Sequence, residues 1–85
     1  MSAESNEQGK PAVWRRIGRR VRKLRKAKGW TLEHLADLID TQKGALSLME
    51  RGERDFGSER LELVSRRLGV TVADLYGQRE GAHAA

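Results

Sequence analysis

Apolar residues recur along this chain at intervals of three and four, the spacing that places them on one face of an α-helix. In the first such segment, Val13, Ile17, Val21 and Leu24 follow one another at intervals of four, four and three, with basic residues between them. The pattern predicts an amphipathic helix over residues 13–28. Gly29 follows it directly and is suited to end it in a left-handed conformation.

Four shorter helices are expected after this one, each bounded by residues typical of helix ends. Thr31, Ser58 and Thr71 are suited as N-caps, and Asp40-Thr41 offers capping chemistry before the third helix. Gly52 follows the third helix, where a residue with positive φ lets the chain leave sharply. The expected segments are residues 31–39, 42–51, 58–68 and 71–76. The fold class predicted is all-α, with five helices around one core.

The two ends of the chain differ from this helical centre. Residues 1–11 are polar and contain the only proline, and residues 78–85 lack a helical pattern. We expect both segments to be disordered tails. The domain organisation predicted is therefore a single domain over residues 12–77 between two tails.

The basic residues are concentrated in one block. Between Lys10 and Lys28 the chain has ten lysines and arginines and no acidic residue, whereas the net charge of the whole chain is only +5. Such a block attracts a polyanion, and a protein that neutralises phosphates gains affinity by releasing counterions. Nucleic acid is the favoured partner, with an anionic lipid surface and a merely solvated helix face as alternatives.

Several function classes lack the residues they would need. There is no cysteine, and His34 and His83 are too far apart to indicate a metal site, so we expect neither a metal nor a cofactor. No apolar run approaches the ~18 residues that a transmembrane helix requires. No nucleophile, paired histidine or phosphate-binding loop points to an enzyme. A protein of the cytoplasm, associated with the nucleoid, is expected.

The second and third predicted helices are short and separated by about three residues, as in a helix-turn-helix. The surrounding pattern resembles the phage-repressor and Cro-like helix-turn-helix family, also called the XRE family, over about 60 of the 85 residues. The residues that carry the resemblance are Ile17-Gly18, Leu24-Arg25, Gly29-Trp30-Thr31, Leu35-Ala36, Leu46-Ser47, Glu50-Arg51-Gly52, Leu61, Leu68-Gly69-Val70 and Asp74-Leu75.

The resemblance implies a five-helix domain like that of lambda repressor, whose third helix lies in the major groove of DNA. It implies an ion pair between Arg25 and Glu50 that joins the first helix to the end of the third. Residues on the groove-facing side of the third helix would contact bases: Gln42, Lys43, Gly44, Ser47 and Leu48. The residues expected to contact phosphates are Arg22, Thr31, Arg51 and Arg54.

Two positions depart from the family pattern. Leu32 stands where the family usually has a glutamine that contacts phosphate, and Gly44 stands where a polar base reader is common. Glycine within a helix also costs ~1 kcal/mol relative to alanine. Both departures weaken direct base readout. We therefore expect DNA recognition to depend more on phosphate contacts and on DNA shape.

The function predicted is a sequence-specific, double-stranded DNA-binding transcription regulator, a repressor. It is expected to act as a homodimer on a two-fold symmetric site, because one recognition helix reads only a few base pairs. The apolar surface for pairing is placed at Val70, Val72, Leu75 and Tyr76. No small-molecule ligand or membrane partner is indicated. The alternatives are an antitoxin or other protein-interaction module on the same fold, and an RNA-binding protein that uses the basic helix.

Overall fold

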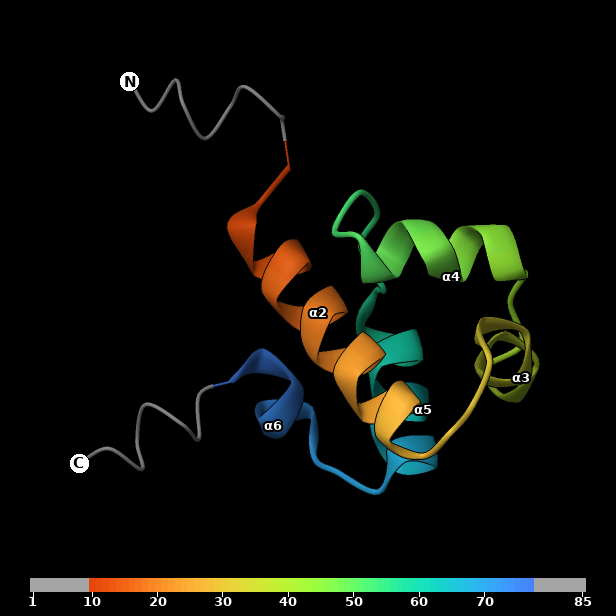
Figure 1. Cartoon of the computed structure of the whole chain (residues 1–85). Coiled ribbons are helices and arrows are strands. Elements are labelled where there is room, and N and C mark those ends of the chain that lie inside the picture. The colour runs from red at the N-terminus through yellow and green to blue at the C-terminus, as the bar shows by residue number, and fades with distance from the viewer. Residues whose placement is uncertain (1–9, 78–85) are drawn as a thin grey trace, which may run out of the picture.

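The computed structural model describes residues 10–77, and within this range the chain forms five α-helices and no strand (Figure 1). The all-helical prediction is confirmed, and each expected helix is present with bounds that differ by at most one residue. The predicted tails lie outside the described residues, except for Lys10 and for Pro11, which is the N-cap of the first helix. The helices are α2 (Ala12–Ala27), α3 (Leu32–Leu38), α4 (Lys43–Glu50), α5 (Ser58–Leu68) and α6 (Val72–Tyr76).

A single core lies where the helices meet. The apolar faces of α2, α3, α4 and α5 supply most of it, and Leu75 of α6 and Phe56 of the loop before α5 complete it. Full burial of a Val, Leu, Ile, Phe or Met side chain stabilises the fold by roughly 1.5–3 kcal/mol relative to leaving it exposed to water. The buried apolar residues are Ile17, Val21, Leu35, Ala36, Ile39, Leu46, Met49, Phe56, Leu61, Val64, Leu68 and Leu75.

Two of the predicted N-caps are present. The Thr31 hydroxyl oxygen accepts a hydrogen bond from the backbone N–H of His34, at 3.0 Å. The Thr71 hydroxyl oxygen accepts one from the N–H of Asp74, whose carboxylate accepts one from the Thr71 N–H in return, both at 3.0 Å. This reciprocal arrangement is a capping box, which satisfies backbone donors that a helix start leaves unpaired.

The other two capping predictions are wrong. Gly57, with φ of 85°, is the N-cap of α5, so Ser58 is already the first helical residue and its side chain caps nothing. At α4 the N-cap is Gln42, again without a side-chain hydrogen bond, while Asp40 takes a left-handed φ of 58° in the turn before it. In both places the N-cap lies one residue from a predicted capping residue. No side chain caps the first backbone N–H groups of α4.

The backbones of α2 and of the end of α4 lie in direct contact. A β-carbon added to Gly18 would overlap the carbonyl oxygen of Met49 and lie 2.5 Å from that of Glu50. A β-carbon on Gly52, which has the predicted positive φ of 77°, would lie 2.6 Å from the Cα atom of Arg15. Only glycine permits both approaches. These contacts press the C-terminal end of α4 against α2 (Figure 1).

Candidate DNA-binding surface

The two ends of α4 differ sharply in burial. At its N-terminal end Gln42, Lys43 and Gly44 are exposed, whereas near its C-terminal end Met49 and Glu50 are buried against the domain. Because α2 holds the C-terminal end, the N-terminal half is left free to approach a large partner. The arrangement suits a helix that is fixed at one end and presents the other.

The exposed side of α4 follows the helical repeat. Gly44, Ser47, Leu48 and Arg51 lie three, four and seven residues apart and therefore share one side, opposite the buried Leu46. Ser47 and Leu48 are half-buried, while Gly44 and Arg51 are exposed. The five residues predicted to contact bases thus lie on the open side and at the open end of one helix.

Arg25 and Glu50 form the ion pair that the resemblance implied. The Arg25 Nε donates to Glu50 Oε2 at 2.8 Å, and Nη2 donates to Oε1 at 3.0 Å, so the contact is bidentate. Both side chains are buried, with 9% and 4% of their surface exposed. The remaining Arg25 Nη1 donates to the carbonyl oxygen of Trp30 at 2.8 Å. One guanidinium therefore joins α2, the end of α4 and the loop that leads into α3.

The residues predicted to contact phosphates are all exposed. Thr31 uses one lone pair of its hydroxyl as the cap of α3, which leaves the hydroxyl proton available to a phosphate oxygen. Arg51 lies 3.9 Å from Glu53 in an exposed ion pair, which contributes little and leaves the guanidinium accessible. Arg54 lies in the loop after α4, and Arg22 lies on α2, between Gly18 and Arg25 on the side that faces α4.

The six arginines of α2 divide into two groups, which the charge count alone did not show. Arg16 donates from Nε to the Tyr76 carbonyl oxygen at 3.2 Å, and Arg20 donates from Nε to that of Asp74 at 2.7 Å. Both arginines therefore hold α6 against α2, where they also meet the negative end of a helix dipole. With Arg25 bound to Glu50, three of the six serve the fold. Arg16 and Arg20 are four residues apart beside Val13 and Ile17, but Arg15 and Arg19 have the same spacing, so the sequence did not distinguish the two pairs.

The loop before α3 is stabilised by ring contacts. Trp30 is half-buried against the core, with the Lys28 ammonium 5.3 Å from its ring centre and the His34 ring at 5.0 Å in an edge-on arrangement. Leu32, which departs from the family pattern, packs against the same core. Leu32 is thus a packing residue and adds little to the apolar surface of the helix pair.

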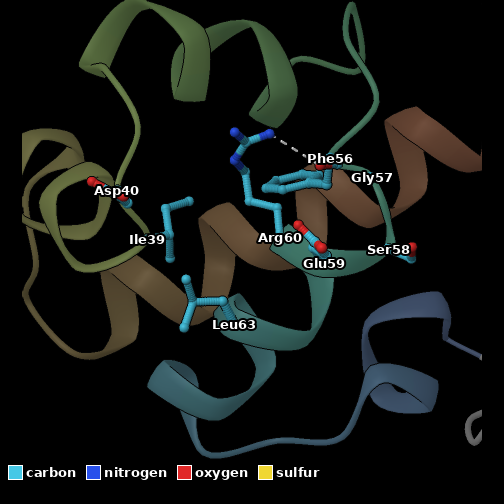
Figure 2. A pocket seen from close by; sticks show the side chains of 8 residues that line it. All are labelled: Ile39, Asp40, Phe56, Gly57, Ser58, Glu59, Arg60 and Leu63. Carbon is cyan, nitrogen blue, oxygen red and sulfur yellow. Dashed lines mark hydrogen bonds between the residues drawn. The ribbon is translucent and has the colours of Figure 1, made fainter.

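A solvent-open pocket of about 530 Å³ lies away from these residues, between the end of α3, the loop before α5 and the start of α5 (Figure 2). It contains the carboxylates of Asp40 and Glu59, and Arg60 donates to the Phe56 carbonyl oxygen at 3.3 Å. Its charge disfavours phosphate, and none of the predicted contact residues lines it. Its lining is Ile39, Asp40, Phe56, Gly57, Ser58, Glu59, Arg60 and Leu63.

Within residues 10–77, no group of three or more His, Asp or Glu side chains is placed to hold a metal ion. No helix in this part of the chain is both long and apolar enough to cross a membrane.

Comparison with known proteins identifies the family. The model of a helix-turn-helix family matches residues 21–75, which is more than half of the chain. The chain is 37% identical over 60 residues to the competence pilus inhibition repressor of Acinetobacter baylyi, a match that covers 71% of this chain. It spans 54% of the length of that repressor.

Solved structures agree with this assignment. The clp gene regulator ClgR from Corynebacterium glutamicum superposes with a TM-score of 0.76 at 36% identity, over 88% of this chain and 80% of that one. SinR, a master regulator for biofilm formation solved in complex with DNA, superposes with a TM-score of 0.64 at 38% identity, over 69% and 95% of the two chains. The chain therefore belongs to the phage-repressor and Cro-like helix-turn-helix family of DNA-binding transcription regulators, which are not enzymes.

Proposed function

We propose that α4 is the recognition helix of this regulator and that it reads bases in the major groove of duplex DNA. Gln42 and Lys43 would supply the polar contacts, since an amide suits adenine and an ammonium suits guanine N7 and O6. Ser47 would contact a base or a phosphate, and Leu48 would pack on a thymine methyl group. Gly44 would allow the helix backbone to approach the DNA closely. The observation that carries the proposal is that α4 is anchored at its C-terminal end and open at its N-terminal end.

Phosphate contacts would fix the position of α4 in the groove. Thr31 lies at the start of α3, Arg51 at the end of α4, Arg54 in the following loop and Arg22 on the neighbouring side of α2. These four residues come from separate elements around the helix pair. They could therefore bind the backbone on both sides of the groove that α4 enters.

Substitution at α4 tests the distinction between base and phosphate contacts. The cognate site is one selected from random duplex DNA by the wild-type protein. Lys43→Ala and Gln42→Ala should each weaken binding to this selected site by about 1–3 kcal/mol and binding to random duplex much less. Arg51→Ala should weaken both by a similar factor. The affinities are compared by fluorescence anisotropy at one salt concentration. If Lys43→Ala weakened cognate and random duplex equally, Lys43 would be a phosphate contact and its proposed reading role would be lost.

We further propose that two copies bind a two-fold symmetric site, with their recognition helices about 34 Å apart on one face of the DNA. The apolar surface for pairing is smaller than the sequence predicted, because Leu75 is fully buried in the core. Val70, Val72 and Tyr76 remain half-buried, and a hollow beside Val72 and Tyr76 reaches the start of α5. Sedimentation of the free protein and of its complex should give two protomers per selected site. One protomer on an asymmetric site would contradict the dimer.

The regulator would act as a repressor by occupying DNA that RNA polymerase needs, on the nucleoid in the cytoplasm. The competing function is a protein-interaction module, such as an antitoxin, with weak DNA binding of its own. The half-buried Leu48 beside Gly44 favours that alternative, because the two residues make the open side of α4 less polar. A mobility shift with duplex DNA and no partner protein separates the two. Binding that appears only when a partner is added would favour the alternative.

A further inference from the structure

Three arginines of α2 have no role within the fold. Arg15, Arg19 and Arg22 are exposed, and they have no hydrogen-bond or ion-pair partner within residues 10–77. They lie four and three residues apart and therefore form one strip along the helix. The other three arginines of α2 bind α6 or Glu50, so the strip holds the arginines of this helix that remain available to a partner.

The strip adjoins the proposed recognition helix. The Cα atom of Arg15 lies against Gly52, the residue that directly follows Arg51, and Gly18 lies against the carbonyl groups at the end of α4. Gly18 is one turn from Arg15 and from Arg22, so the strip runs beside the C-terminal end of α4. Arg15 therefore lies close to the residue that directly follows Arg51.

The strip is unfavourable to the isolated helix. Like charges three and four residues apart repel one another, and α2 has no acidic residue in its first turn to offset the positive end of the helix dipole. A partner with dense negative charge would relieve this repulsion. Guanidinium groups also suit phosphate oxygens, because they offer paired N–H donors in a plane.

We infer that Arg15 and Arg19, together with Arg22, form a phosphate-binding strip that extends the DNA-binding surface from α4 onto α2. The inference rests on the proposed DNA-reading function and adds Arg15 and Arg19 to it. The strip binds the sugar–phosphate backbone beside the groove that α4 enters, so it adds affinity without sequence preference. Leu32 and Gly44 depart from the family pattern and lack the DNA contacts that other residues would make there. The strip restores part of the DNA affinity that these two positions do not provide.

The test is the salt dependence of DNA binding by the full chain. We compare wild type with Arg15→Gln/Arg19→Gln and with a matched control, Lys10→Gln/Arg66→Gln, which removes two exposed charges outside α2. The slope of log K against log salt is negative, and losing two phosphate contacts should make it less steep by about 1.8. The affinity ratio of wild type to the strip variant should then grow about twelvefold between 200 and 50 mM salt. Cognate and random duplex should lose affinity equally.

Folding is measured on the same samples. The strip variant should melt no lower than wild type, because the substitution removes repulsion and no protein contact. A slope equal to that of wild type, or an equal fall in the control variant, would overturn the strip while leaving base reading by α4 intact. If the DNA affinity of the wild-type protein did not change with salt concentration, the DNA-binding function itself would be contradicted.

Discussion

Replacing Gly18 with alanine should destabilise the domain, although alanine is the better helix former. Gly→Ala within a helix ordinarily gains about 0.5–1 kcal/mol. At Gly18 the new β-carbon would overlap the Met49 carbonyl oxygen and lie 2.5 Å and 2.8 Å from the oxygen and carbon of the Glu50 carbonyl. These atoms are backbone and cannot rotate away, so α2 and the end of α4 must separate by roughly 1 Å to restore ordinary carbon–oxygen contact distances.

Separating the helices costs packing on both sides of the contact. Overpacking of this kind costs about 1–3 kcal/mol and occasionally more, and a gap of ~1 Å forfeits up to half of each neighbouring dispersion contact. After the helical gain is subtracted, the net loss is about 1 kcal/mol. In a domain of this size that lowers the melting temperature by about 4–8 °C.

Gly44→Ala is the matched control for this experiment. Gly44 is also helical and has no atom within 4 Å of an added β-carbon, so the helical gain should appear undiminished. Thermal unfolding followed by circular dichroism should therefore show Gly18→Ala melting below wild type and Gly44→Ala melting above it. A Gly18→Ala variant as stable as wild type would refute the close contact between α2 and α4.

Three further outcomes are expected. Removing one partner of the Arg25–Glu50 pair should cost about 3–5 kcal/mol, and melts of Arg25→Met, Glu50→Gln and the double variant should be strongly non-additive; additive losses would mean that the two groups do not interact. Thr71→Ala should lose about 1 kcal/mol through the capping box, seen as a fall of about 4–8 °C in melting temperature, and an unchanged melt would exclude that cap. Gly44→Ala, despite its greater stability, should bind the selected duplex more weakly, because its methyl group would stand between α4 and the bases; undiminished affinity in the same anisotropy assay would place Gly44 away from the DNA.

Much of the fold was predictable because helix periodicity and end signals act locally. The spacing of Val13, Ile17, Val21 and Leu24 identified α2 and its buried side directly from the sequence. The cap errors at Ser58 and Asp40 have a local cause as well. Several residues near each helix start could serve as the cap, and tertiary packing, which the sequence pattern does not contain, decides which one turns the chain.

The division of the basic block was beyond sequence reasoning. The resemblance singled out Arg25, but Arg16 and Arg20 look the same in sequence as Arg15 and Arg19, and only the position of α6 separates them. Such contacts join residues up to sixty positions apart, and no local spacing rule predicts them. The candidate base contacts on α4 were predicted from the family resemblance, because membership of the family indicates which helix enters the major groove.

Selection of binding sites from random duplex DNA, carried out in parallel with wild type and with Lys43→Ala, tests the central claim most directly. Wild type should enrich a two-fold symmetric consensus whose half-sites lie about one helical turn apart. Lys43→Ala should enrich the same consensus with the preference lost at one base pair in each half-site and kept elsewhere. A consensus unchanged by the substitution, or no enrichment by either protein, would contradict the reading of DNA by the N-terminal half of α4.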